Sequence, residues 1–210
     1  MRYYVSLLTA VFFMLPNNAG ELESTLSQDI NAVMTKVTDW RHHFHEFPEL
    51  SNREFKTQKS ISEALIEMGL EPNTECGKTG VVAFIRGQNP GPLIALRADI
   101  DGLPVTEKLN LSFSSKERTL YQGNDVGIMH ACGHDAHIAT LLGVASFISQ
   151  NTDKLNGDIM LIFQPAEEGA PEGEEGGAEL MLKEGLFVVE KPDAIFGMRV
   201  SNSKHGQLWT

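Results

Sequence analysis

The stretch that most constrains this chain is Gly127 to His137, which reads GIMHACGHDAH. From His130 onward it holds three histidines, one cysteine and one aspartate, in a chain that has 7 histidines and 2 cysteines among 210 residues. Imidazole together with thiolate is a ligand mix that zinc and its first-row neighbours prefer. The cluster therefore predicts a metal site. The competing interpretation, ordinary polar histidines and a small buried cysteine, is less favoured by such a dense cluster.

The spacing of the ligands predicts their local structure. Cys132 and His134 would point to opposite sides of a helix but to one side of an extended segment, so the pair is expected before a helix. Gly133 permits a tight turn between them, and Asp135 is expected to cap the helix that follows. The positive end of that helix would favour a thiolate. His137 is expected to support a ligand or to be an ordinary polar residue.

Cys76 and Cys132 are the two cysteines of the chain. A disulfide between them would remove the thiolate that the metal site needs, so both are expected to be free. A thiol or redox function is disfavoured because no CxxC pair is present.

The first 20 residues have the pattern of a signal peptide. Arg2 supplies positive charge, an apolar run covers Val5 to Leu15, and Pro16 precedes small residues. The run is too short to span a bilayer, so the mature chain, 21–210, is expected to be secreted or periplasmic and not inserted in a membrane. The alternative is an amphipathic terminus. The formal net charge of −11 argues against nucleic acid or anionic membrane as a partner.

Apolar periodicity predicts helices and strands that alternate along the second half of the chain, which is typical of an α/β sheet with some parallel strands. The expected helices are Ser24 to His45, Glu54 to Met68, Ala136 to Ile148 and Gly177 to Glu184. The expected strands are Val81 to Ile85, Leu93 to Ala98, Asp158 to Phe163 and Ala194 to Met198. A second histidine group, His42, His43 and His45, would spread around the first helix, so a structural role is expected for it.

Polar motifs follow three of these strands: ADID ends at Asp101, QPAEE at Glu168, and a turn runs from Gly197 to Arg199. Ligand sites in α/β sheets gather at the carboxyl ends of strands, so these segments are expected to meet the Cys132 loop. Glu167 and Glu168 should point to opposite sides of an extended chain, one toward a metal and one toward a water whose pKa the metal lowers. The alternative is a solvated acidic loop.

Four motifs carry a resemblance to a known family. They are HEFPELS (His45 to Ser51), RADIDGLP (Arg97 to Pro104), HACGHDAH (His130 to His137) and LIFQPAEEG followed by GGAELML. In this order they resemble the metal-dependent amidohydrolases, which include aminoacylases, hippurate hydrolases, auxin-conjugate hydrolases and related carboxypeptidases. The resemblance covers almost all of Leu22 to Val200. It implies a three-layer, zinc-peptidase-like α/β domain with a mixed, largely parallel sheet.

The resemblance also implies an activity and roles for residues. The activity is hydrolysis of the amide bond of an N-acyl amino acid or short peptide, with two divalent ions, zinc, manganese, cobalt or nickel, in a complete site. By position, Cys132, His134 and Glu168 resemble metal ligands and Glu167 the general base. Asp101 resembles an aspartate that orients a ligand, while Asp99 and Arg97 are expected to be structural.

Two departures from the family pattern bear on activity. The family has a ligand histidine at the position of Arg199, and a guanidinium has no lone pair to offer a metal. His205, six residues further on, is a poor replacement.

Relatives also continue into a lid and dimerisation domain with a further histidine ligand, so this chain is expected to be the first half of the catalytic domain. A homodimer, as in full-length relatives, is doubtful for it. The alternative to an enzyme is a non-catalytic remnant that at most binds metal.

Overall fold

The structure is a computed structural model that describes residues 19–200, with side chains from residue 31 onward. Its helices are α2 (Ala19–Glu46), α3 (Phe55–Glu67), α4 (His134–Ser149), the 3-10 helix η1 (Thr152–Lys154) and α5 (Gly177–Lys183). Its strands are β1 (Val81–Arg86), β2 (Asn89–Asp99), β3 (Arg118–Tyr121), β4 (Asn124–Gly127), β5 (Asn156–Gln164) and β6 (Ala194–Gly197). All the helices and strands expected from periodicity are present. Residues 1–18 lie outside the described part, so the signal peptide stays a prediction.

The main sheet has four strands in the order β1-β5-β2-β6. Strand β2 runs parallel to both β5 and β6, and β1 runs antiparallel to β5. In register, Ala98 lies beside Phe163 and Arg97 beside Gly197. The carboxyl ends of β2, β5 and β6 therefore lie at one edge of the sheet. The expected fold class, α/β with a mixed and largely parallel sheet, is confirmed.

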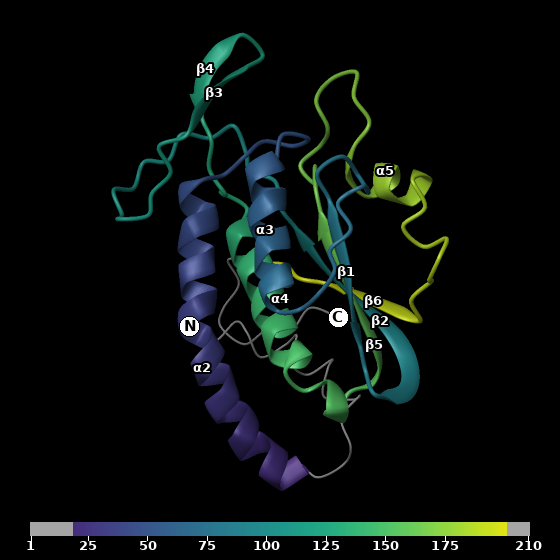
Figure 1. The fold of residues 1–210 in the computed structure, drawn as a ribbon. Coiled ribbons are helices and arrows are strands. Elements are labelled where there is room, and N and C mark those ends of the chain that lie inside the picture. Colours follow the sequence, from purple (N-terminus) through teal and green to yellow (C-terminus); the bar gives the residue numbers. More distant parts are fainter. Residues whose placement is uncertain (1–18, 201–210) are drawn as a thin grey trace.

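Helices α2, α3 and α4 lie on one side of the sheet, and the short helix α5 lies on the other side, toward one end (Figure 1). Alternate residues of the central strands, such as Leu96 and Leu161, belong to the larger core shared with α3 and α4. Their neighbours Ala95 and Met160 face the other side and pack with Met181 of α5. This period-two division of apolar residues is expected when both faces of a sheet are covered. The central strands, whose ends carry the polar motifs, are thus fixed by apolar packing on both faces.

Helix α2 covers the outer side of α4 and fixes its position. Gly143 permits the close approach, because a Cβ at that position would come within 2.5 Å of Val37 Cγ2. Phe44, near the end of α2, is 2% exposed and belongs to the same core. The start of α4, which carries the histidine cluster, therefore has little freedom to shift.

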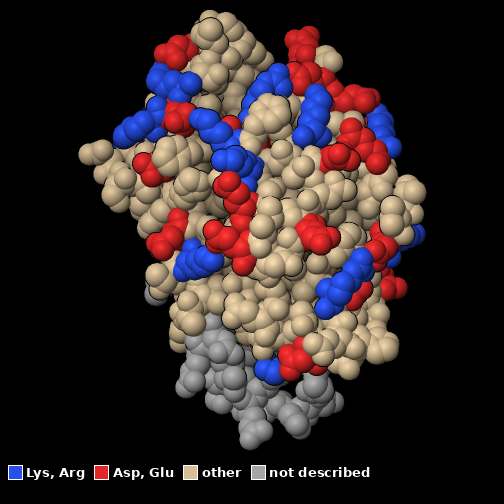
Figure 2. Space-filling view, viewed as in Figure 1, with Lys and Arg blue, Asp and Glu red and all other residues tan. Residues whose placement is uncertain are grey.

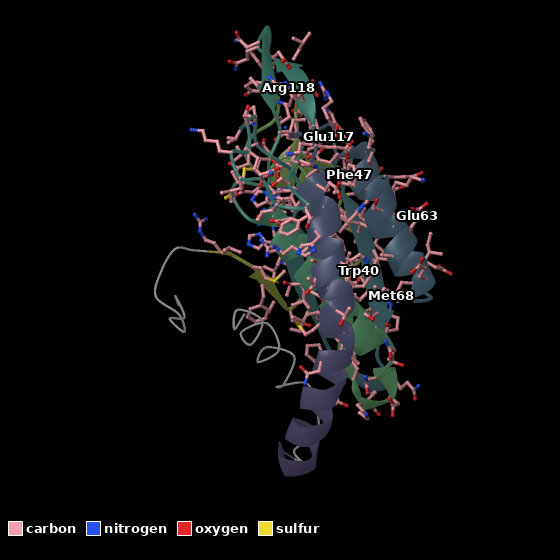
Figure 3. All side chains as sticks on the ribbon, turned by 90° about the vertical axis from the view of Figure 1, so that its left-hand side faces the viewer. Trp40, Phe47, Glu63, Met68, Glu117 and Arg118 are labelled. Atoms are coloured by element: carbon pink, nitrogen blue, oxygen red, sulfur yellow. The ribbon has the colours of Figure 1, made fainter. Side chains whose placement is uncertain are left out.

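The hairpin of β3 and β4 was not expected from the sequence. Its turn uses Gln122 and Gly123, with φ of 50° and 79°, and such turns more often show Asn-Gly or Asp-Gly. Arg118 bonds to Asp125 across the two strands. Figures 1 and 3 show the hairpin extending beyond the helices. Strand β4 ends at Gly127, and the histidine cluster follows it directly in the chain.

On the face drawn in Figure 2, acidic and basic side chains intermix over the upper half of the molecule. Within residues 19–200, no helix has the length and apolar character needed to cross a membrane.

Candidate metal centre

The ligand loop turns into α4 at Gly133, whose φ of 88° is in the left-handed region. Gly133 is therefore the N-cap and His134 the first helical residue, so the expectation that Asp135 caps the helix is wrong. Asp135 lies in the first turn, 2% exposed, and pairs with His45. Cys132 precedes the helix, as expected.

The imidazole of His134 has one nitrogen held by the protein and one facing the site. Its Nδ1 lies 2.8 Å from the backbone oxygen of Asp101 and 3.3 Å from Asp101 Oδ1. Two oxygen neighbours hold a proton on Nδ1, so that in the neutral ring the lone pair is on Nε2. A histidine fixed in this way through its other nitrogen is the usual arrangement of a metal ligand. The position of Asp101 agrees with its expected orienting role.

The three expected ligands come together. One ligand atom from each of Cys132, His134 and Glu168 lies within 4.8 Å of the other two. Thiolate, imidazole and carboxylate together suit a divalent ion such as zinc. Without a cation the thiol is not activated: burial, followed by the bond and charge of Glu168, raises the pKa of Cys132 to about 11. A thiolate at Cys132, as the sequence led us to expect, would therefore depend on a bound cation.

Asp101 connects the ligands behind the site. Its Oδ2 accepts the Ser51 hydroxyl at 2.7 Å and the Glu168 backbone N–H at 2.9 Å. Burial opposes its charge, but the bonds from His134, Glu168 and Ser51 outweigh burial and hold the pKa of Asp101 below its ordinary value. A buried carboxylate that stays ionised orients His134 and fixes the backbone of Glu168.

Glu167 and Glu168 lie near the same imidazole nitrogen. Glu167 Oε2 is 3.6 Å and Glu168 Oε1 is 3.8 Å from His134 Nε2. The expected extended geometry, with the two carboxylates on opposite sides, is therefore wrong. The chain turns at these two residues directly after Ala166, whose φ is 49°. Their separate roles, ligand and base, stay predictions.

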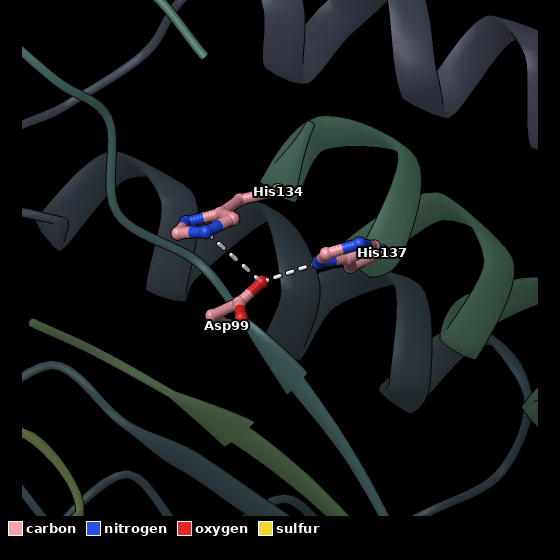
Figure 4. A group of neighbouring side chains, drawn as sticks. All are labelled: Asp99, His134 and His137. Carbon is pink, nitrogen blue, oxygen red and sulfur yellow. Dashed lines mark hydrogen bonds and ion pairs between the residues drawn. The ribbon is translucent and has the colours of Figure 1, made fainter. Parts of the chain in front are cut away.

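Asp99 and His137 form a second polar group beside the first (Figure 4). Asp99 Oδ1 lies 2.6 Å from His137 Nδ1 and 3.5 Å from His134 Nε2. The other nitrogen of His137 accepts the Val200 backbone N–H at 2.9 Å. An ion held by Asp99, His134 and His137 would have to break these bonds, so the group suits a supporting role. That agrees with the expectation for both residues.

Among the described residues after β6, 198–200, none is a suitable metal ligand. Arg199 is exposed and, as a guanidinium, has no lone pair for a metal. His205 lies outside the described residues. The residues that the structure describes thus fit one cation, at Cys132, His134 and Glu168, and Arg199 does not fit as a ligand of a second.

Sequence reasoning missed one buried residue next to the site. Glu54 is 0% exposed, and its Oε1 accepts the Ala166 backbone N–H at 2.9 Å. Its Oε2 accepts the Thr79 hydroxyl at 2.6 Å. Burial raises the pKa of Glu54 against the opposing effect of these bonds. Periodicity indicates only that Glu54 starts a helix, because its partners lie far away in sequence.

The fold and the group of candidate ligands define a catalytic-type α/β domain with a candidate cation site at the carboxyl edge of its sheet. The sequence model described as peptidase family M20/M25/M40 matches residues 95–208. The chain belongs to this family, which is metal-dependent.

Similar proteins agree with this assignment. The chain is 42% identical over 184 residues to thermostable carboxypeptidase 1 of Saccharolobus solfataricus, covering 87% of this chain and 44% of that protein. It is 45% identical over 179 residues to N-acetyl-L-cysteine deacetylase of Bacillus subtilis, covering 83% and 39%. Among solved structures, the Bacillus subtilis YXEP protein, described as a dinuclear metal-binding peptidase of the M20 family, matches with a TM-score of 0.70 and 42% identity, covering 81% and 44%. The chain thus spans less than half the length of these relatives.

Proposed function

We propose that this chain carries the cation-binding part of an amidohydrolase site that cleaves the amide bond of N-acyl amino acids or short peptides. The observation that carries the proposal is the convergence of Cys132, His134 and Glu168 on one centre, with Glu167 beside them. The deacetylase and carboxypeptidase named above support this substrate class.

In this proposal, Cys132, His134 and Glu168 hold the ion. When bound, a divalent cation lowers the pKa of water and polarises the amide carbonyl. Glu167, within 3.6 Å of the ligand imidazole, takes the proton from the attacking water and later delivers it to the leaving amine. Asp101 keeps His134 in the Nδ1–H form, so that Nε2 faces the ion.

Arg199 favours a second candidate function, cation binding without hydrolysis. The related YXEP protein is dinuclear, whereas Arg199 has no lone pair to offer a second ion. Because one ion can both activate water and polarise a carbonyl, hydrolysis is the first candidate.

Two variants test the proposal. We expect Glu167→Gln to keep cation affinity but to lower release of amine from an N-acetyl amino acid by about 100- to 10,000-fold, as loss of a general base does. Cys132→Ser is expected to weaken cation binding and activity together. Calorimetric titration with Zn²⁺ or Mn²⁺ and an amine-release assay measure the two quantities. Cation binding with no release by the unaltered chain at any cation concentration would establish the second candidate instead.

We also propose that residues 1–20 direct export, on the charge and apolar pattern of this segment. N-terminal sequencing of the protein recovered from periplasm or medium tests it, with a start near residue 21 expected.

A further inference from the structure

Ala166 has a backbone conformation that its own side chain disfavours. Its φ of 49° is in the left-handed region, where residues with a Cβ are uncommon. Asn and Asp enter this region more readily, because their side chains bond locally, but alanine has no such group. A residue of this kind persists there only when its surroundings impose it, and such residues cluster at functional sites. Ala166 directly precedes Glu167 and Glu168.

A fully buried carboxylate holds this residue. Glu54 Oε1 accepts the Ala166 N–H at 2.9 Å, and the Thr79 hydroxyl at 2.6 Å fixes the other oxygen. The backbone oxygen of Glu54 in turn accepts the Gln58 N–H at 2.8 Å, which attaches it to the first turn of α3. Pro165 has no N–H to offer, so Ala166 supplies the first backbone donor after β5. The position of the Ala166 amide is thus set from α3.

Two buried carboxylates therefore hold the acidic turn at two amides. Asp101, after β2, accepts the N–H of Glu168 at 2.9 Å, and Glu54 accepts that of Ala166. Between these two points lies Glu167, whose carboxylate is 3.6 Å from His134 Nε2. If the Ala166 bond were lost, the residue would relax toward negative φ and the following side chains would change direction.

We propose that Glu54 is a positioning residue that holds Ala166 in the left-handed conformation and thereby aims Glu167 and Glu168 at the cation site. The proposal rests on the cation site argued above. It assigns to α3 a part in the metal centre, although no residue of that helix is among the expected ligands.

Glu54→Met tests it, because methionine has a similar length but no acceptor for the Ala166 N–H. We expect Zn²⁺ affinity to fall by about 10- to 100-fold, as for other residues that orient metal ligands. Glu54→Gln keeps an amide oxygen for the same N–H and is expected to keep most of the affinity. Adding Ala166→Gly to Glu54→Met should recover part of the loss, because glycine adopts positive φ without a Cβ penalty.

Glu49→Met is the matched control. Glu49 also accepts one backbone N–H and one threonine hydroxyl, both from Thr57, at 2.9 and 3.0 Å. Its substitution is expected to lower stability with no change in Zn²⁺ affinity, whereas a merely structural role for Glu54 would make the two variants alike. If Glu54→Met does not fold, Glu54→Asp, which keeps the charge but is too short to reach Ala166, replaces it with the same expected loss.

Hydrogen exchange at the Ala166 amide separates this proposal from the proposed function. We expect Glu54→Met to speed that exchange whether or not the unaltered chain binds Zn²⁺. Failure of the unaltered chain to bind Zn²⁺ would remove the proposed function, and faster exchange would still support the contact from Glu54. Unchanged exchange together with unchanged Zn²⁺ affinity in folded Glu54→Met would overturn the positioning role.

Discussion

The chain has two groups of three histidines, one at the end of α2 and one around the start of α4, and they differ in what surrounds each ring. In the α2 group, His42 stacks on Phe113 with ring centroids 3.8 Å apart, and His43 is exposed. His45 is buried, with Nδ1 2.9 Å from Asp135 and Nε2 3.3 Å from Glu107. Every nitrogen of His45 therefore has a protein partner.

In the α4 group, His134 keeps one nitrogen available. Its Nδ1 is bonded to Asp101, while Nε2 makes no hydrogen bond within the described residues and has carboxylate oxygens of Asp99, Glu167 and Glu168 at 3.5, 3.6 and 3.8 Å. His137 resembles His45 instead, because both its nitrogens are bonded. The comparison teaches that the density of histidines does not make a cation site. A site needs an imidazole whose second nitrogen is not engaged in a hydrogen bond and faces other candidate ligands.

The two groups are also coupled. Asp135 follows His134 directly and accepts bonds from His45 and from Arg41 Nε, both of α2. His45 of α2 thus holds the first turn of α4, which carries the candidate ligand His134. A structural histidine and a candidate ligand are linked through one buried carboxylate.

The largest expected effect tests the difference between His134 and the α2 histidines directly. We expect His134→Gln to weaken Zn²⁺ binding by about 100- to 1,000-fold. This range is the effect of losing one ligand when the binding free energy of a structural zinc site is divided equally among its ligands. His43→Gln, a change of the same type at an exposed position, is expected to leave the affinity unchanged. Calorimetric titration of both variants measures this. Equal losses in the two would contradict the distinction between the groups.

The next effect concerns the link between the groups. Asp135→Ala leaves His45 and Arg41 without their shared partner, and breaking a buried ion pair in this way typically costs about 3 kcal/mol. Chemical denaturation should show this loss in the free energy of unfolding. The exposed Asp153 of η1 provides the control, since Asp153→Ala removes no buried pair. A loss for Asp135→Ala as small as that of the control would show that the link contributes nothing.

The sequence predicted much of the fold, because apolar periodicity reports burial directly. It gave the four main strands, the helices and the meeting of the ADID, QPAEE and Cys132 segments at one edge. It missed the β3–β4 hairpin, whose Gln-Gly turn lacks the usual asparagine or aspartate. The sequence also misplaced the helix cap, since both Gly133 and Asp135 are typical of helix starts and only the backbone angle distinguishes them.

Within the candidate site, the convergence of the expected ligands was predictable and the residues that support them were not. Cys132, His134 and Glu168 belong to short motifs, so spacing and resemblance locate them. The bond from Glu54 to Ala166 spans 112 positions, and the left-handed Ala166 has no sign in the sequence. The direction of Glu167 and Glu168 depends on that one backbone angle, which is why an extended chain was the wrong expectation.

The smallest expected effect is the pH dependence of the stability that His45 of the α2 group contributes to the fold. The bond to Asp135 is the main cause that raises the pKa of His45 above its ordinary value, against the opposing effect of burial, and Glu107 adds to it. Despite burial, the bond from His45 lowers the pKa of Asp135, and the bonds from the Ser115 backbone N–H and then from His45 lower the pKa of Glu107, so both stay ionised near neutral pH. Protonated His45 therefore faces two carboxylates, with Arg41 as the other nearby cation.

A histidine whose pKa is higher in the folded state stabilises the fold fully below its unfolded pKa of about 6.5, and this contribution is lost as the pH rises through the folded pKa. We therefore expect the loss of unfolding free energy in His45→Gln to be larger at about pH 5.5 than at about pH 9. Urea denaturation of both proteins across this range measures the difference. His43→Gln, at an exposed ring near Ser60, is the matched control for the loss of an imidazole. A loss in His45→Gln that grew with pH would mean that His45 is held neutral by burial, and the α2 group would then lack the ion pair that distinguishes it from His134.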